Sequence, residues 1–293
     1  MRNAFIDELV TLAKTNPKIA LVVGDLGYSV VEPFANEFPE RFINAGVAEQ
    51  NMMGLAAGMA SEGYHVFVYS IANFPTFRCA EQIRNDVAYH GLPVTVVAVG
   101  GGLAYGNLGY SHHAVQDYGL MRLFPGILIA APGDPMEVRA CLRYLVSHPQ
   151  PSYLRLGKTG EKHFHSNVPD VIPGKWLEIQ AVCGATKAIL TTGAALQWAA
   201  QVLASESPAA VYSMPLWSMS VRSEQVVQMQ VWQKVITFED HLLDGGFGSW
   251  LLESLVREPQ QISKVDVRAL NPSVCGLVGR QETLNALGWQ TPV

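Results

Sequence analysis

The sequence has 293 residues, enough for about two domains of ordinary size. Its net charge is −5, and Lys and Arg are scattered rather than clustered, so nothing suggests nucleic-acid binding. No stretch reaches the ~18 apolar residues of a membrane span, and no apolar run near the start marks a signal peptide. We therefore expect a soluble, cytoplasmic protein, and the four separated cysteines are typical of reduced core thiols: Cys79, Cys141, Cys183 and Cys275.

Strands and helices alternate through the first half of the chain. The pattern predicts strands at 19–23, 42–44, 65–69, 94–99, 127–130 and 152–156, and helices at 2–14, 48–61, 76–89, 115–123 and 134–147. Such alternation indicates a parallel sheet with helices on both faces, here as a first domain at 1–158.

A polar stretch with two prolines and no periodicity follows at 159–176, and we interpret it as a linker. A second alternation then predicts strands at 187–191, 209–213, 234–238 and 262–267, and helices at 194–205, 223–230, 246–257 and 280–287. The expected fold is α/β, with a second domain at 177–293 that also has a mainly parallel sheet. Glu239–His241 fall at a strand end, where a solvated connector is the simpler interpretation.

One carboxylate stands at the start of an otherwise apolar helix. Met52–Ala60 contains no charged side chain, which predicts a helix buried on all sides, and Glu49 lies in its first turn. The helix N-terminus favours the anion, but loss of water favours the neutral acid more strongly, so Glu49 is a candidate site residue. Gly54 and Gly58 suggest that another backbone packs against this helix.

A plainer interpretation of Glu49 stays open: it could cap its own helix or pair with Arg41 or Arg84. The glycine-rich loop at 100–113 ends in His112 and His113, which suit proton transfer near pH 7.

Several segments resemble the transketolase family. GVAEQNMMGLAAGMA, SHHAVQDYGLMRLFPG, APGDPMEV and YLRLGK resemble the pyrimidine-binding domain, and EDHLLDGGFGSWLLE resembles a helix start in the C-terminal domain. The Gly-Asp-Gly…Asn signature that binds diphosphate and magnesium is absent, so the chain is similar to the C-terminal subunit of a split transketolase.

This resemblance implies thiamine diphosphate as cofactor. The matching Glu49 would hydrogen-bond a ring nitrogen of the aminopyrimidine and promote loss of the thiazolium proton. His112 matches a histidine that contacts reacting oxygens, and His113 occupies the next position. The ring wall around the pyrimidine maps to Ile71, Phe74 and Phe77, so an aliphatic side chain replaces one aromatic ring.

Substrate positions match the family less completely. Arg2, Ser29 and Lys158 fit phosphate-contacting positions, whereas a phosphate-binding histidine is replaced by Gly100. The family's acidic pair falls on Asn107 and Leu108, and the aspartate at the second position reads the sugar's hydroxyl configuration. We therefore expect an unusual donor or acceptor sugar.

The resemblance also implies partners. We expect an N-terminal, diphosphate-binding subunit that holds most of the Mg²⁺ ligands, a heterotetramer of two copies each, and no metal ligand in this chain. The alternatives are the beta subunit of a 2-oxoacid dehydrogenase, which shares the fold and the glutamate, and a catalytically inactive scaffold.

Overall fold

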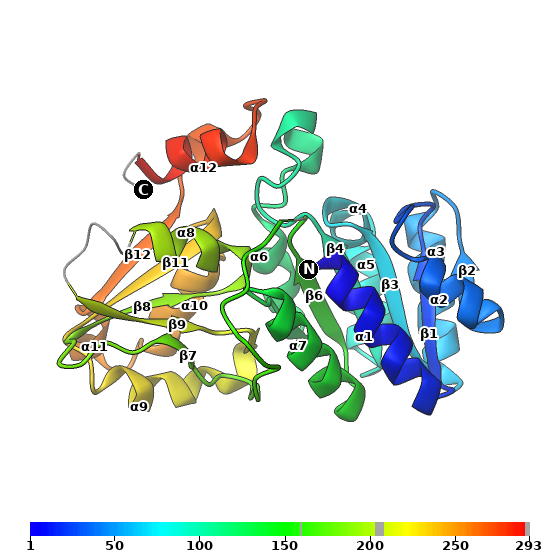
Figure 1. Ribbon diagram of the computed structural model, residues 1–293, viewed down its shortest axis with the longest axis horizontal. Helices are drawn as coiled ribbons and strands as arrows, with labels where there is room; N and C mark the ends of the chain where they lie inside the picture. Colours follow the sequence, from blue (N-terminus) through cyan, green and yellow to red (C-terminus); the bar gives the residue numbers. More distant parts are fainter. Residues whose placement is uncertain (159, 203–207, 291–293) are drawn as a thin grey trace.

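The computed structural model describes residues 1–158, 160–202 and 208–290 and contains two sheets that lie side by side, each flanked by helices (Figure 1). Parallel pairing dominates both sheets, which confirms the predicted α/β fold class. No helix within these ranges is both long and apolar enough to cross a bilayer. All four cysteines are free, but the expectation of core thiols is wrong for Cys183, which is exposed.

The first sheet has the strand order β10-β5-β6-β4-β3-β1-β2. Its strands are β1 (Ile19–Val23), β2 (Phe42–Asn44), β3 (His65–Ile71), β4 (Val94–Val99), β5 (Leu128–Ala130), β6 (Ser152–Leu156) and β10 (Leu216–Trp217). Neighbours among β1 to β6 pair in parallel, and every residue of β1, β4 and β6 is buried. Continuous apolar runs form these strands because helices cover both faces of the sheet.

One face of this sheet carries α1 (Arg2–Thr15), α2 (Glu32–Glu37) and α7 (Pro135–Ser147). The other face carries α3 (Glu49–Ser61), α4 (Asn73–Phe77), α5 (Ala80–Gln82), the π-helix η2 (Ile83–Ala88) and α6 (Asp117–Arg122). The single helix predicted at 76–89 is therefore wrong. Helix α4 ends at Phe77, and the later part of the segment is a π-helix rather than an α-helix. Its wider turn is seen in the bond from the Tyr89 N–H to the Arg84 carbonyl, five residues earlier (3.1 Å).

Helix α3 is not buried on all sides, contrary to the prediction. Met52, Met53 and Ala56 face the core, but Gly54, Leu55 and Gly58 are exposed. A Cβ atom added at Gly54 or Gly58 would meet nothing within 4 Å in the part of the chain that the structure describes. A helix sequence without charged residues shows that the helix is apolar, but it does not show how many of its faces are buried by the rest of the same chain.

The second sheet has the order β12-β11-β8-β9-β7, with only β7 antiparallel to its neighbour. Its strands are β7 (Leu177–Gln180), β8 (Lys187–Thr191), β9 (Ala209–Ser213), β11 (Lys234–Leu242) and β12 (Val265–Leu270). Its helices are α8 (Leu196–Val202), α9 (Gln225–Met229), α10 (Phe247–Ser254), α11 (Pro259–Ile262) and α12 (Gln281–Gln290). The end of the helix predicted at 194–205 lies outside the described residues.

The two sheets share one apolar core. Strand β10 belongs to the second half of the sequence, but it joins the first sheet, where it pairs antiparallel with β5 at the edge. Trp217 on this strand is fully buried, with its ring 5.3 Å from Tyr118 and 5.4 Å from Phe247. The cluster around it includes residues of both sheets, so the two halves cannot separate without exposing large aromatic surfaces.

A buried ion cluster also joins the halves. Arg155 on β6 donates from Nε to Asp117 Oδ2 (2.7 Å) and from Nη1 to Asp240 on β11. All three side chains are at most 2% exposed. The expectation that Glu239–His241 form a solvated connector is therefore wrong, because β11 continues through them and all three are buried.

Glu239 binds the free backbone N–H groups at the N-terminus of helix α10. Its carboxyl group accepts the backbone N–H of Phe247 (2.6 Å) and of Gly248 (2.8 Å), and burial raises its pKa to about 8. The carboxyl groups of Glu239 and Asp240 can be buried because the first accepts N–H groups at the start of α10 and the second accepts a hydrogen bond from Arg155.

The segment 160–176 contains no helix or strand and is fastened to α7. Asp134 caps α7 by accepting the Glu137 N–H (2.7 Å), and its other oxygen accepts the N–H groups of Phe164 and His165. Burial alone would raise the pKa of Asp134, but bonds from His165 and these amides lower it to about 2. Asp134, Glu137 and His165 are close enough to share a metal ion, yet N–H groups already occupy both Asp134 oxygens, so this cluster is a helix cap.

Arg155→Met should destabilise the protein by about 3–5 kcal/mol, because Asp117 and Asp240 would remain buried without a cation. Urea unfolding of the purified chain measures this. Lys234→Met is the matched control: its pair with Asp266 lies at the surface, and its loss should cost less than about 1 kcal/mol. A similar loss in both variants would contradict a structural role for the buried cluster.

The attachment of 160–176 should weaken with rising pH. The hydrogen bond to Asp134 raises the pKa of His165, so its stabilisation is complete below the unfolded value of about 6.5 and is lost as pH rises through the folded value. The free energies of unfolding of the wild-type chain and His165→Asn, measured in urea, should differ more at pH 6 than at pH 8, because only protonated His165 adds a charge to the bond with Asp134. The control is the exposed His163→Asn, which should unfold at the wild-type urea concentration at pH 6, and a difference between wild type and His165→Asn that does not change with pH would refute the assignment.

Candidate active site

Glu49 is the first residue of α3 and lies at the edge where the parallel strands end. Its side chain is 5% exposed, and Oε1 accepts a hydrogen bond from Arg78 Nη1 (2.8 Å). Neither of the expected arginine partners is correct. Arg41 instead bonds to backbone carbonyls near α1, and Arg84 bonds to Asn85. Glu49 makes no side-chain cap of its own helix, whose N-cap is Ala48.

Arg78 connects Glu49 to an aromatic ring. Its guanidinium carbon lies 4.3 Å from the centroid of the Phe74 ring while the same group donates to Glu49. Arg78 was not among the site residues expected from the sequence. Its position four residues after Phe74 is the i,i+4 spacing that brings side chains together on a helix, and this was the available signal.

A hollow of about 520 Å³, here called the aromatic hollow, opens beside this pair. It is lined by Asn73, Phe74, Phe77, Arg78, Tyr110, Ser111, His113 and Gln116. A second hollow surrounds Glu49 and also includes Arg78, so Arg78 separates the two. The structure therefore brings Glu49, Phe74, Phe77 and His113 to one region, and it adds Asn73, Arg78, Tyr110 and Gln116, which the sequence did not single out.

The residues 100–113, called the histidine loop below, contain the short 3₁₀ turns η3 (Gly106–Leu108) and η4 (Tyr110–His112). The end of this loop forms one wall of the aromatic hollow through Tyr110, Ser111 and His113. Asn73 Nδ2 donates to the carbonyls of Ser111 (2.9 Å) and His113 (3.1 Å), which fixes the end of the loop to α4. The Asn73 Oδ1 atom has no hydrogen-bond partner within the described residues.

His112 and His113 differ in their surroundings. The His112 ring stands edge-on to Phe74, with centroids 5.2 Å apart, and its Nδ1 lies 3.0 Å from Ser111 Oγ. His113 is 1% exposed, and burial lowers its pKa. A buried neutral imidazole at the wall of a hollow can accept a proton or donate a hydrogen bond to a bound polar group.

The other predicted residues are more dispersed. Arg2 Nε donates to the Lys158 carbonyl (2.7 Å), and Lys158 Nζ lies 4.9 Å from the centroid of the Tyr105 ring. Ser29 is exposed, with a left-handed φ of 64°, and its N–H bonds to Glu32. Ile71 ends β3 and lines neither hollow, whereas Leu108 is 50% exposed at the tip of the histidine loop.

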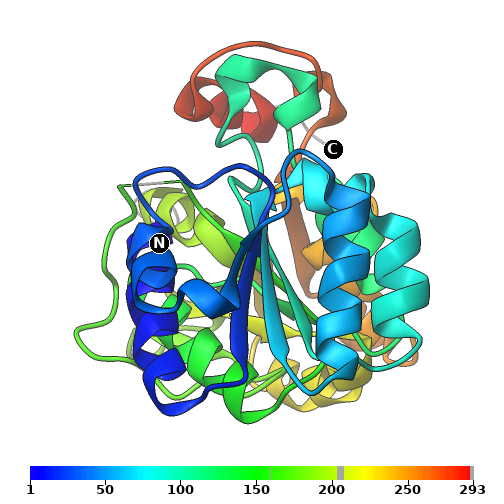
Figure 2. The same cartoon turned by 90° about the vertical axis from the view of Figure 1, so that its right-hand side faces the viewer.

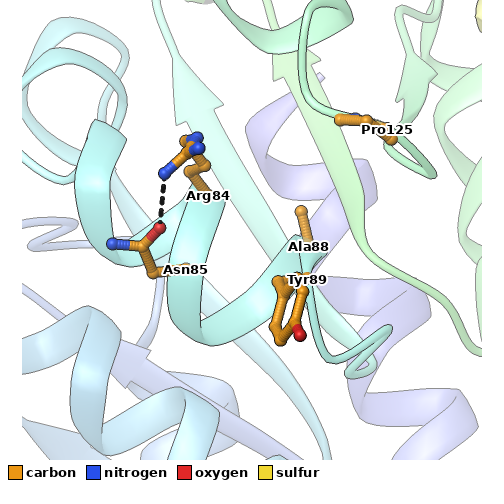
Figure 3. A pocket seen from close by; sticks show the side chains of 5 residues that line it. All are labelled: Arg84, Asn85, Ala88, Tyr89 and Pro125. Atoms are coloured by element: carbon orange, nitrogen blue, oxygen red, sulfur yellow. Dashed lines mark hydrogen bonds between the residues drawn. The ribbon is translucent and has the colours of Figure 1, made fainter.

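A larger hollow, about 620 Å³, lies away from this region on the π-helix (Figure 3). It is lined by Arg84, Asn85, Ala88, Tyr89 and Pro125. It contains none of the predicted site residues, and the only bond among its side chains joins Arg84 to Asn85. Size alone therefore does not make it the better candidate.

The comparisons with known proteins agree with the motifs. Residues 1–160 match the family model described as transketolase, pyrimidine binding domain. One subunit of the apulose-4-phosphate transketolase of Phocaeicola vulgatus is 31% identical over 277 residues, which cover 91% of this chain and 86% of that protein. The 6-deoxy-6-sulfo-D-fructose transketolase subunit SqwH of a Clostridium species is 30% identical over 275 residues, or 92% of this chain and 84% of that protein.

A solved structure described as a split gene transketolase, inactive beta4 tetramer, superposes with a TM-score of 0.80 at 31% identity. The match covers 99% of this chain and 96% of that one, so it includes both sheets. The chain belongs to the transketolase family and corresponds to the C-terminal subunit of a split transketolase.

Proposed function

We propose that this chain is the C-terminal subunit of a thiamine-diphosphate-dependent transketolase that moves a two-carbon ketol unit from a ketose donor to an aldose acceptor. The proposal depends mainly on one observation, the arrangement of Glu49, Arg78 and Phe74. The buried carboxyl group of Glu49 accepts a hydrogen bond from the planar guanidinium of Arg78, which lies over the Phe74 ring.

The residues present fit an aminopyrimidine. The Arg78 guanidinium is planar, donates to Glu49 and stacks on Phe74, and an aminopyrimidine would make the same two contacts. We propose that Arg78 takes this position in the free subunit and moves aside when the cofactor is bound. Its side chain is 49% exposed, so solvent is available to receive it.

The bound cofactor would supply the carbanion chemistry that breaks and forms the carbon–carbon bond. Glu49 would hold a proton at the hydrogen bond to the pyrimidine ring nitrogen, and the bound ring would shield that bond from water where Arg78 shields Glu49 now. Phe74 and Phe77 would support the ring, and His112 and His113 would contact substrate oxygens and move protons between them.

The relatives support a two-subunit enzyme. Those from P. vulgatus and Clostridium are named as subunits, and the solved split-gene protein is described as an inactive tetramer of its beta chains. We propose that a separate diphosphate-binding subunit completes the site here, holds most of the Mg²⁺ ligands and assembles as a heterotetramer. The exposed apolar face of α3 at Gly54, Leu55 and Gly58 is available for such a contact.

We also propose an atypical sugar substrate. Leu108 occupies the position of the aspartate that the family uses to read a sugar hydroxyl, and its half-exposed side chain cannot accept a hydrogen bond. The relatives are named for apulose 4-phosphate and for a sulfonated deoxyfructose, neither of which is an ordinary pentose or hexose phosphate.

Glu49→Gln tests the assignment. Assembled with the diphosphate-binding subunit, this variant should lose about 100-fold or more in kcat, because an amide cannot exchange a proton with the ring nitrogen. The exposed Glu62→Gln at the end of the same helix is the control and should retain wild-type turnover. Ketol transfer by this chain alone, or full turnover by Glu49→Gln, would disprove the proposal, as would oxidation of a 2-oxoacid with an electron acceptor as the main activity.

Leu108→Asp tests the substrate proposal. In the assembled enzyme it should raise kcat/KM for standard sugar phosphates by about 10-fold, because it restores a hydrogen-bond acceptor for a hydroxyl group. The neighbouring exposed Asn107→Ser, which adds no charge, should change the ratio between substrates by less than about 3-fold. Wild-type rates with standard sugar phosphates that equal those of ordinary transketolases would end this idea.

A further inference from the structure

The histidine loop is held at its tip by the end of the chain. Figures 1 and 2 show the loop, in blue-green, projecting beyond both sheets and lying against the red segment that contains α12. This red segment, Asn271–Gln290, is called the C-terminal brace below and includes η8 (Pro272–Val274) and α12.

A small apolar cluster joins the loop to the brace. All five members are buried. Leu103 belongs to the loop and Val115 lies two residues beyond its end, whereas the other three come from the second half of the chain: Leu270, Val274 and Leu284. This cluster is separate from the two large cores on the two faces of the first sheet. The C-terminal half therefore provides an apolar support for the loop.

Gly106 in the loop is fitted to the brace. Its carbonyl accepts the N–H of Gly279 (3.2 Å). A Cβ atom at Gly106 would lie 2.6 Å from Leu284 Cδ1 and 2.9 Å from the Gly279 carbonyl, so only glycine permits this approach. The contact is one of backbone against backbone, as expected where two segments must keep a fixed separation.

The base of the loop is held from both halves of the chain. Gly102 and Ala114 pair as a short antiparallel bridge, and Arg155 Nη2 donates to the Ala114 carbonyl (2.8 Å). The Leu242 N–H donates to the Val115 carbonyl (3.0 Å), which joins β11 to the chain just beyond the loop. Base and tip are therefore both fastened to the C-terminal half, and His112 and His113 lie between them.

We propose that the C-terminal brace is a positioning element that sets the location of His112 and His113 through the contact of Leu284 with Gly106. The loop contains glycine at five of its first ten positions, so a free loop would sample many conformations. A displacement of about 1 Å in a catalytic group can lower turnover by about 100-fold. Only the catalytic consequence rests on the proposed function; the bracing itself does not.

The test compares two buried leucines of the C-terminal half. Leu284 contacts the loop, whereas Leu255 lies in the large core beside α10, away from it. In the isolated full-length chain, Leu284→Ala should accelerate amide hydrogen exchange at 103–113 by about 10-fold or more, while Leu255→Ala should leave exchange there unchanged. The conservative Leu284→Met, which keeps a side chain of similar volume, should show exchange at 103–113 as slow as in the wild-type chain.

The second arm uses the complex with the diphosphate-binding subunit, at a temperature where every variant is folded. Leu284→Ala should lower kcat by about 10-fold with less than about 3-fold change in the KM for thiamine diphosphate, whereas Leu255→Ala should retain kcat. Unchanged exchange at 103–113 in Leu284→Ala would overturn the bracing. Faster exchange with unchanged kcat would overturn the positioning role. If the wild-type complex transfers no ketol unit, the proposed function fails, and the exchange experiment still decides whether the brace exists.

Discussion

The structure depends on one buried cation. Arg155 lies on the central part of the first sheet, and its guanidinium is shared between Asp117 and Asp240, which come from opposite halves of the chain. Removing three charges from water is costly, and the arrangement is stable only because nearly every donor of the guanidinium has an acceptor. The same group bonds to the Ala114 carbonyl at the base of the histidine loop. Joining the two halves and anchoring the loop are thus consequences of a single interaction.

The site beyond this anchor has two walls with different sources of rigidity. Phe74 belongs to α4, which packs on β3 and β4, so the ring wall is held by the main core. The opposite wall is a glycine-rich loop that has little core of its own and depends on contacts with β11, with the brace and with Asn73 of α4. Glu49 lies in the neighbouring hollow on the other side of Arg78 and is paired with this half-exposed arginine. Mobility in this region is therefore expected in Arg78 and the loop rather than in the glutamate.

Sequence reasoning was most accurate where one physical rule dominates. Ile19–Val23 and Val94–Val99 are continuous apolar runs, and burial on both faces gives such runs only one regular structure in a parallel sheet. It failed where distant partners decide. Glu239–His241 look like a solvated connector until Arg155 and the start of α10 are placed beside them, and Thr76–Tyr89 has a helical pattern that does not reveal a π-turn. For the site, Glu49 could be selected locally, but its contact with Arg78 could not.

The exposed face of α3 illustrates the limit of a single chain. The helix that begins at Glu49 is apolar through most of its length, and the core of this chain covers only one side of it. Gly54 and Gly58 have no packing role within the described residues, although glycine in a helix interior costs about 1 kcal/mol relative to alanine. Favourable contacts with the backbone of another polypeptide, which could approach closely where the helix has no side chains, would offset this cost. The helix that begins at Glu49 therefore also carries the exposed surface that we propose for contact with the partner subunit.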